Sequence, residues 1–383
     1  MSDKRSRRLL IVLSLLAGVL TGEPAARAEV YETPAHAAIL IDLQSGQELY
    51  AKNADVPLHP ASMSKLMTAL MVFERLADGS LSLDDTLPVS ENAWRKGGSK
   101  MFVDLGSRVR VEDLLHGIIV QSGNDACIVV AEALGGTEEA FSEQMTKRGR
   151  ELGLTHSVFK NASGWPDPDH LMSARDLATL ATIIIQQYPQ YYKIFGEKEF
   201  IYNNIRQHAR NPLLYQDIGA DGLKTGHTEE AGYGLTASAV RDGRRLVMVL
   251  AGLQRPGDRA REAAGLLDYG YRNFKNYQLF VRGDAVEQAD VWLGNAGSVP
   301  LVVQEDVWVS LSADGRRDLR VKVVYDGPIP APIANGSQVA ELEITAPGVE
   351  PRRIPLIAGD TVQAASMFGR MSSAIGYLIW GPS

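Results

Sequence analysis

The sequence predicts an α+β fold in which helices and a helical subdomain flank an antiparallel sheet, followed by a small all-β sandwich domain and a C-terminal amphipathic helix. Three observations lead to this prediction. A hairpin pattern, a long helical region and three strand patterns follow one another between residues 37 and 253. Short alternating runs separated by Gly, Pro and Asp turns replace them beyond residue 276, and residues 361–380 return to helical periodicity. Strands from both ends of the first region can join one sheet that the helices cover.

The first 28 residues have the pattern of an export signal. Basic residues between Lys4 and Arg8 precede an apolar core at 9–20, and Ala26-Arg27-Ala28 supplies a cleavage site. The core is short for a membrane span, and an uncleaved anchor is the alternative interpretation. We therefore expect a signal peptide over 1–28 and an exported chain that begins near Glu29.

Composition excludes some classes of function. The 383 residues carry a net charge of -7, and this acidic balance argues against a nucleic-acid partner. Cys127 is the single cysteine, so the chain has no internal disulfide. Because Cys127 lies in an apolar helical run, we predict a small core residue rather than a nucleophile.

The N-terminal half of the first domain should contain a hairpin and several helices. Residues 37–43 and 47–52 are β-compatible around a Gln44-Ser45-Gly46 turn, and a loop with two prolines then leads to a helix over 62–77. Residues 80–110 are rich in turns. Helical patterns occupy the ranges 111–120, 125–134, 137–152 and 174–187, and Ser173 has the position of an N-cap for the last.

Strand patterns dominate the later part of the chain. We predict strands over the ranges 222–226, 233–241 and 244–253. Asp242-Gly243, a typical hairpin turn, joins the last two, and a helix over 258–274 follows. Further short β runs occur at 291–293, 301–303, 307–311, 319–325 and 339–344. We therefore expect one domain over 29–275 and a β-sandwich over 276–358.

The terminal segment, 359–383, is expected to form an amphipathic helix from Thr361 to Trp380. Its apolar residues fall on one face, and no run is long enough to span a bilayer. Such a helix can lie in a membrane interface, or it can pack on its own domain. Only Arg370 is basic, so the pattern leaves both interpretations open.

Ser62 and Lys65 form the first candidate catalytic pair. On a helix, positions three apart share a face, so the two side chains would point into the same space. A lysine in a partly dry pocket loses its proton more easily and can activate a serine hydroxyl. The alternative interpretation is a capped helix with a solvent-facing lysine.

Two further patterns lie far along the chain. Ser122-Gly123-Asn124 occupies a break between helices, where side chains can project into a cleft. Lys224-Thr225-Gly226 lies on a predicted strand, where Lys224 would attract a carboxylate and Gly226 would let a ligand backbone lie close. Ser90-Glu91-Asn92 repeats the Ser-x-Asn pattern, which shows how often that pattern arises by chance.

The order Ser-x-x-Lys, Ser-x-Asn and Lys-Thr-Gly is typical of penicillin-recognising serine enzymes. Within that superfamily the chain resembles the D-alanyl-D-alanine carboxypeptidases, which are low-molecular-mass penicillin-binding proteins, over nearly all of the mature chain. The stretches that carry the resemblance are PASMSKLMT (60–68), QSGNDAC (121–127), SARDLA (173–178), DGLKTGHTEEAGY (221–233), AREA (260–263) and YDGPIPAPI (325–333). The resemblance implies a β-lactamase/transpeptidase-like fold for 29–275.

The resemblance also implies roles for the residues that match its motifs. Ser62 would be the acylated nucleophile and Lys65 its base, while Ser122 and Asn124 would move a proton and hold the substrate amide. The backbone N–H groups of Ser62 and His227 would form the oxyanion hole, and His227 would assist deacylation.

Four residues would bind the substrate's terminal carboxylate or lie beside it. Lys224 and Thr225 would bind it directly, whereas Arg210 and Arg261 resemble family arginines near the cleft. A surface ion pair is the alternative for each arginine. The resemblance further implies a substrate-binding role for Gly226, and it requires no cofactor and no metal.

The implied function is removal of the terminal D-alanine from peptidoglycan pentapeptides, with β-lactams as inhibitors that acylate Ser62. The protein would act at the periplasmic face of the inner membrane, attached through residues 361–383 and without a nucleic-acid partner. Two features depart from the family pattern: Trp165 replaces a smaller apolar residue, and the terminal helix is less basic than many family anchors.

Three alternatives are weighed against this function. A class A β-lactamase would need a Glu-x-x-Leu-Asn base near residues 160–175, and that motif is absent. A zinc peptidase would need closely spaced histidines, whereas the nearest pair is His156 and His170. A non-enzymatic cell-wall scaffold with a relict site is disfavoured because every motif residue is intact.

Overall fold

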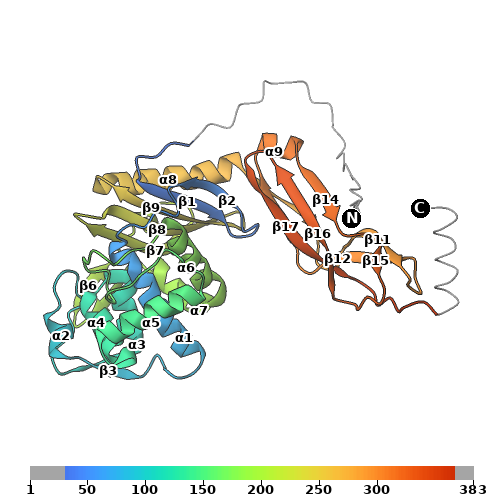
Figure 1. Ribbon diagram of the computed structural model, residues 1–383. Helices are drawn as coiled ribbons and strands as arrows, with labels where there is room; N and C mark the ends of the chain where they lie inside the picture. Colours follow the sequence, from blue (N-terminus) through green and yellow to red (C-terminus); the bar gives the residue numbers. More distant parts are fainter. Residues whose placement is uncertain (1–30, 367–383) are drawn as a thin grey trace. The chain divides into compact units, whose positions relative to one another are not determined.

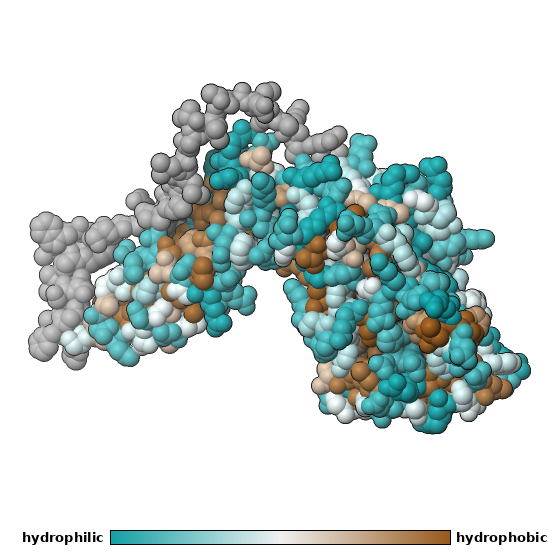
Figure 2. Space-filling view, turned by 180° about the vertical axis from the view of Figure 1, so that it is seen from behind, coloured by the Kyte–Doolittle hydropathy of each residue, from teal (hydrophilic) through white to brown (hydrophobic). Residues whose placement is uncertain are grey.

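The computed structural model describes residues 31–366, which form two compact units (Figure 1). One unit comprises residues 31–272, and the other comprises 273–366. In these residues no helix combines the length and apolar character needed to cross a membrane. The face drawn in Figure 2 is mostly hydrophilic, with hydrophobic groups interspersed.

A five-stranded antiparallel sheet organises the first unit, as predicted. Its strands follow the order β2-β1-β9-β8-β7, so the N-terminal hairpin pairs with strands from the end of the unit. Their bounds are β1 Ala37–Asp42, β2 Glu48–Lys52, β7 Ala220–Thr228, β8 Gly232–Arg241 and β9 Arg244–Leu253. The β8–β9 turn is Asp242-Gly243, with positive φ at both residues, which is the geometry of a tight hairpin.

Helices cover both faces of this sheet (Figure 1). Helix α8 (Pro256–Asn273) lies on one face, where a Cβ added to Gly270 would come within 2.6 Å of Leu40. Helix α6 (Ala174–Gln187) packs against β1 and β9 on the other, and Ser173 caps it by accepting from Asp176 N. Strand β1 is therefore buried on both sides, which explains its nearly continuous apolar sequence.

The remaining helices form the helical subdomain below the sheet in Figure 1. Helix α1 runs through its centre and is buried from its first residue to Phe73. The helix bounds are α1 Lys65–Ala77, α2 Glu91–Arg95, α3 Val111–His116, α4 Asn124–Gly135, α5 Glu138–Glu151 and α7 Pro189–Tyr192. Two short antiparallel ladders complete the unit: β3 Thr86–Pro88 with β4 Arg108–Arg110, and β5 Glu199–Tyr202 with β6 Ile205–His208.

Two predicted helices differ in detail, and both differences lie at the site. The helix expected from Ser62 begins with a 3₁₀ turn, Ala61–Ser64, and becomes α-helical only at Lys65. The helix expected over 111–120 ends at His116 and continues as a π-helical turn, Gly117–Gln121. Such wide turns are frequent at functional sites because they redirect the chain.

The second unit is all-β apart from the short helix α9 (Ala313–Arg317). Strands β10 and β13 form a pair, and six others form a sheet in the order β14-β16-β17-β12-β11-β15 around buried Leu301, Leu342 and Leu356. The strand bounds are β10 Lys275–Phe280, β11 Ala285–Trp292, β12 Ser298–Val303, β13 Val307–Leu311, β14 Arg320–Val324, β15 Ile329–Pro330, β16 Gln338–Ala346 and β17 Val349–Ala358.

The prediction of a terminal helix is wrong for its first residues. Residues 361–366 are not helical: Val362 forms a bridge with Ile333, and Ala364 forms a bridge with Gly294. Val362 is also buried, so this segment completes the edge of the β unit rather than beginning an amphipathic helix. The rest of the predicted helix, residues 367–383, lies outside the described residues.

Candidate active site

The turn that carries Ser62 brings it against Lys65. Lys65 Nζ donates to Ser62 Oγ at 2.8 Å, as the spacing of the two residues predicts. Neither Pro60 nor Ser64 caps its helix with a side chain, and Lys65 is only 1% exposed. The alternative of a capped helix with a solvent-facing lysine is therefore wrong.

Lys65 is held by two further acceptors from distant segments. Its Nζ donates to Asn124 Oδ1 at 2.8 Å and to the backbone oxygen of Ser163 at 2.6 Å. Together with Ser62 Oγ, these acceptors match the three N–H donors of the Lys65 ammonium group. Burial lowers the pKa of Lys65 from 10.5 to about 8, because desolvation penalises the ammonium form. A neutral amine that can accept the Ser62 proton is therefore accessible near neutral pH.

Ser122 follows the π-helical turn in the left-handed region, with φ 67°. Its Oγ is buried and has no hydrogen-bond partner in the described part of the chain, although the residue lines the cavity beside Ser62. Buried hydroxyls are normally paired, so this one is available to a ligand or to a transferred proton. Asn124 begins α4 and donates from Nδ2 to the oxygen of Gly97 at 2.9 Å, which orients its Oδ1 toward Lys65.

Asp125 holds the loop beside this break and was not anticipated from the sequence. Its carboxylate accepts from the backbone N–H groups of Met101, Phe102 and Val103. The only local signal was an acidic residue in the first turn of a predicted helix, which the helix dipole explains equally well.

Strand β7 supplies the opposite wall of the cleft. Thr225, Gly226 and His227 line the cavity, whereas Lys224 is buried behind them with Nζ 3.3 Å from the oxygen of Thr225. Burial and the nearby Lys65 place the pKa of Lys224 well below its usual value. His227 is exposed and stacks on Tyr233, with ring centroids 3.9 Å apart.

The structure gives a packing reason for glycine at position 226 in addition to the predicted room for a ligand. A Cβ at this position would lie 2.6 Å from the carbonyl oxygen of Pro60, so the missing side chain lets β7 pack against the turn that carries Ser62. The glycine therefore brings nucleophile and strand together, rather than only leaving room for a ligand.

The two predicted arginines have different positions. Arg210 lines the cavity, and its Nη1 donates to Ser99 Oγ at 2.6 Å. Arg261 is not among the lining residues: its side chain is 62% exposed and pairs with Asp258 at 2.8 Å and Glu262 at 3.1 Å. The prediction of a cleft role for Arg261 is corrected to the surface ion pair that was its alternative.

Arg259, two residues earlier on α8, occupies the cavity instead. Its Nε is buried and finds no hydrogen-bond partner within residues 31–366, and its guanidinium lies 5.7 Å from the centre of the Tyr233 ring. Residues two apart on a helix point about 200° apart, so only one of the two arginines can face the cleft. The sequence contained both candidates, Asp-Arg-Ala-Arg, but not the helical phase that separates them.

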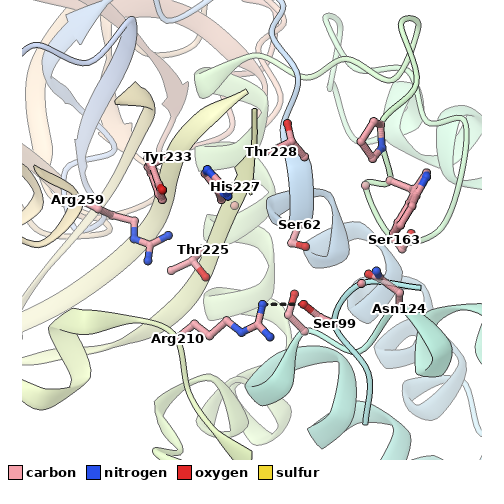
Figure 3. Close-up of a pocket in the computed structure, with 16 residues that line it drawn as sticks. Ser62, Ser99, Asn124, Ser163, Arg210, Thr225, His227, Thr228, Tyr233 and Arg259 are labelled. Carbon is pink, nitrogen blue, oxygen red and sulfur yellow. Dashed lines mark hydrogen bonds between the residues drawn. The ribbon is translucent and has the colours of Figure 1, made fainter. Parts of the chain in front are cut away.

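These groups enclose a cavity of about 520 Å³ (Figure 3). Figure 3 shows Ser62 between two groups: Arg210 and Arg259 near Thr225 on one side, and Asn124 and Ser163 on the other. No acidic side chain is among the described residues that line it. Such a cavity favours a carboxylate at its arginine end and an acyl group beside Ser62.

The loop 160–172 lines the cavity on the side opposite the arginines, where Figure 3 shows Ser163. Asn161 Oδ1 accepts from the N–H groups of Ser163 and Trp165, and thus fixes the oxygen of Ser163 that binds Lys65. His170 pairs with Ser64 Oγ at 2.7 Å and ties the same loop to the Ser62 turn. Because the lining residues of this loop include no carboxylate, the site lacks the base of a class A β-lactamase.

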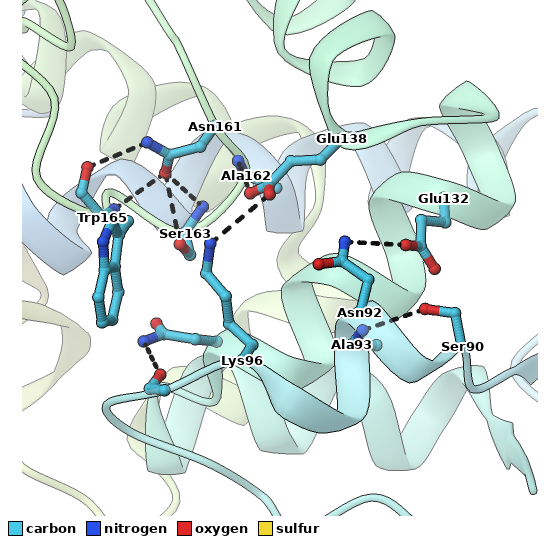
Figure 4. Close-up of polar contacts among 12 residues, drawn as sticks. Ser90, Asn92, Ala93, Lys96, Glu132, Glu138, Asn161, Ala162, Ser163 and Trp165 are labelled. Carbon is cyan, nitrogen blue, oxygen red and sulfur yellow. Dashed lines mark hydrogen bonds and ion pairs between the residues drawn. The ribbon is translucent and has the colours of Figure 1, made fainter. Parts of the chain in front are cut away.

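The second Ser-x-Asn pattern is structural. Ser90 caps α2 by accepting from Ala93 N at 3.0 Å, and Asn92 donates to Glu132 at 3.1 Å (Figure 4). Neither residue lines the cavity.

Comparison with known proteins agrees with this geometry. A family model described as D-alanyl-D-alanine carboxypeptidase matches residues 24–254, and a model of the penicillin-binding protein 5 C-terminal domain matches residues 274–364. The chain belongs to the S11 family of D-alanyl-D-alanine carboxypeptidases. The carboxypeptidase DacD of Escherichia coli K12 is 35% identical over 379 residues, which cover 96% of this chain and 98% of the relative.

Solved structures extend the likeness to both units. Penicillin-binding protein 5 of Haemophilus influenzae superposes with a TM-score of 0.82 at 33% identity, covering 88% of this chain and 99% of that one. Penicillin-binding protein D2 of Listeria monocytogenes, solved in an ampicillin-bound form, has a TM-score of 0.59 at 27% identity and covers 64% of this chain and all of its own.

In this carboxypeptidase, most sequence-predicted site residues converge. Ser62, Ser122, Asn124, Arg210, Thr225, Gly226 and His227 all line one cavity. Lys65 and Lys224 lie directly behind the lining, and Cys127 is fully buried in α4, as predicted, with its pKa raised to about 12 by burial. No group of three or more His, Cys, Asp or Glu that could hold a metal ion occurs in residues 31–366.

Proposed function

We propose that Ser62 is the acylated residue of this carboxypeptidase and that its substrate is the peptidoglycan pentapeptide. The observation that carries the proposal is the 2.8 Å contact between Lys65 Nζ and Ser62 Oγ. The contact joins a nucleophile to a base whose pKa is lowered to about 8, in a cavity that also holds two guanidinium groups.

Each group at the site would carry out one step of the reaction. Neutral Lys65 removes the proton from Ser62 Oγ, which attacks the carbonyl carbon of the penultimate D-alanine. The N–H groups of Ser62 and His227 would stabilise the resulting oxyanion. The proton then passes through Ser122 to the nitrogen of the departing D-alanine, and the C–N bond breaks to leave an ester on Ser62. Water, activated at the same base, hydrolyses this ester and regenerates the serine.

The terminal carboxylate of the substrate belongs at the arginine end of the cavity. Arg210 and Arg259 both line it, and Thr225 presents a hydroxyl between them and Ser62 (Figure 3). Lys224 lies buried behind the strand, with its Nζ 3.3 Å from the oxygen of Thr225. A substrate without the free carboxylate would lose these contacts, so the arrangement favours cleavage at the chain end.

We also propose that β-lactams acylate Ser62. Support comes from the family and from the related penicillin-binding protein D2, which was solved with ampicillin. Attack by Ser62 Oγ would open the lactam ring and form an ester, while the released amine remains tethered in the cavity and hinders entry of water.

The test combines fluorescent penicillin labelling with D-alanine release from a pentapeptide. We expect both activities in the wild type and neither in Ser62→Ala. Asn124→Ala should reduce labelling strongly because it removes a partner of Lys65, whereas the matched change Asn92→Ala, at the structural Ser-x-Asn pattern, should leave labelling unchanged. A wild type that neither labels nor releases D-alanine would disprove the proposal.

We propose finally that the protein is exported and attached to the periplasmic face of the inner membrane through its C-terminal segment. The signal pattern over 1–28 and the apolar periodicity of the terminal segment support this location. Deletion of residues 367–383, which spares the bridges of Val362 and Ala364, should move the protein from the membrane to the soluble periplasmic fraction. A full-length protein already in the soluble fraction would contradict the anchor.

A further inference from the structure

We propose that Trp165 is a specificity-determining residue, whose indole supports an extended aliphatic side chain on the residue that precedes D-Ala-D-Ala in the substrate. This inference rests on the proposed function and adds a substrate preference to it. The relevant feature is an aromatic wall at the end of the cavity away from the arginines, formed by the loop 160–172.

The ring of Trp165 lies at the border of the cavity and remains accessible. The residue lines the cavity, yet 42% of it is exposed. Its edge lies over the glycine pair of the facing loop: a Cβ on Gly98 would come within 3.0 Å of the ring, and one on Gly97 within 3.5 Å. These glycines leave space for the indole to bridge the two loops and form a wall.

Hydrogen bonds hold the backbone of Trp165 in place relative to the catalytic base. Asn161 Oδ1 accepts from the N–H of Trp165 at 2.9 Å, and Asn161 Nδ2 donates to the oxygen of Trp165 at 3.0 Å (Figure 4). The same amide oxygen accepts from the N–H of Ser163, whose carbonyl binds Lys65. The backbone that carries the indole is therefore linked to Lys65 through Asn161 and Ser163, so a ligand that packs on the indole requires little reordering of this loop on binding.

Charges near the ring favour an uncharged contact. Lys96 Nζ lies 5.2 Å from the ring centre and 3.6 Å from Glu138 Oε2, so its charge is balanced locally. The other end of the cavity contains Arg210 and Arg259 and accepts the carboxylate. Figure 3 shows Ser163 on the far side of Ser62 from the two arginines, so a substrate oriented by that carboxylate extends its upstream residue past Ser62 toward Ser163 and the neighbouring Trp165. The methylene groups of an aliphatic side chain would pack against the apolar face of the indole there.

The test compares two tripeptides that differ only at the first residue: Nα,Nε-diacetyl-L-Lys-D-Ala-D-Ala and acetyl-Gly-D-Ala-D-Ala. We expect Trp165→Ala to lower kcat/KM for the lysine peptide about tenfold, the loss expected when about two methylene groups lose their apolar contact. The glycine peptide should change by less than about twofold, because it has no side chain to place on the ring.

Trp94→Ala is the matched control, because Trp94 is similarly exposed, at 41%, and does not line the cavity. Trp94→Ala should leave the ratio of kcat/KM for the lysine peptide to kcat/KM for the glycine peptide unchanged. Trp165→Phe should retain most of the wild-type preference for the lysine peptide. An equal fall for both peptides, or no change for either, would overturn the inference. Urea unfolding measures the stability of the alanine variant. If that variant is unstable, Trp165→Leu replaces it in the comparison of the two peptides. A wild type inactive on both peptides would instead refute the proposed function.

Discussion

Replacing Gly164 by alanine tests how the turn that carries Ser62 is held in place. Gly164 has φ +70°, and a Cβ at this position would lie 1.9 Å from the carbonyl oxygen of Ala61 and 2.6 Å from its carbonyl carbon. The obstacle is backbone rather than a flexible side chain. Ala61 immediately precedes the nucleophile, so relief of the clash must displace the Ser62 turn, the loop 160–172 or both.

Two separate effects should lower the free energy of unfolding of Gly164→Ala. An L-residue in the left-handed region loses about 1–2 kcal/mol relative to glycine. The overlap, about 1.5 Å short of the 3.4 Å at which ordinary contact begins, adds an overpacking cost of about 1–3 kcal/mol. We therefore expect Gly164→Ala to reduce the free energy of unfolding by about 2–5 kcal/mol. Because a displacement of about 1 Å can cost about 100-fold in rate, acylation by penicillin should fall by about that factor.

Gly153→Ala separates the two costs. Gly153 has φ +82° with nothing within 4 Å of its added Cβ, so its variant incurs the conformational cost alone. Urea unfolding gives the stability of both variants, and fluorescent penicillin labelling gives the acylation rate. Equal stability losses for the two variants, together with unchanged acylation in Gly164→Ala, would refute the reasoning.

Two further predictions concern pH. The acylation rate should rise about tenfold per pH unit below pH 8 and level off above it, because the folded-state pKa of Lys65 is lowered to about 8 and only the neutral amine accepts a proton; a flat profile from pH 6 to 8 would contradict this base. Burial lowers the pKa of His170 from 6.5 to about 4, so the unfolded chain binds more protons between these values and the free energy of unfolding decreases as the pH is lowered. Urea unfolding should show a loss of about 2 kcal/mol from pH 7 to 5 that His170→Asn abolishes, and an equal loss in the variant would count against this assignment.

The parts of the fold that sequence patterns predicted are those with local causes. The hairpin turn Asp242-Gly243 and the cap at Ser173 both lie where predicted, because turn and capping chemistry depends on a few neighbouring residues. The Ser62–Lys65 contact is also local, since i and i+3 spacing holds in the 3₁₀ turn as it does in an α-helix.

The failures have non-local causes. Arg259 and Arg261 occur in the same four residues, and only the packing of α8 on the sheet decides which one faces the cavity. The segment after Thr361 has helical periodicity but pairs with residues 294 and 333, because extended partners there satisfy its backbone groups. Strand β17 was missed because its polar residues hide a strand that pairs with both β16 and β12.

Three glycines explain why the catalytic motifs depend on one another despite their separation. Gly98 meets the amide of Asn124, Gly164 meets the carbonyl of Ala61, and Gly226 meets the carbonyl of Pro60, each so closely that a Cβ would lie within 2.8 Å of its neighbour. The walls of the cleft thus approach one another closely where side chains are missing, against backbone at Ala61 and Pro60 and against the side-chain amide of Asn124. A Ser-x-x-Lys pattern alone specifies a nucleophile and a base, but the burial that lowers the pKa of Lys65 also requires the distant segments that carry Asn124 and Ser163, both of which accept from its Nζ. The chemistry at Ser62 is therefore determined by residues about 35 to 165 positions away as much as by its own helix.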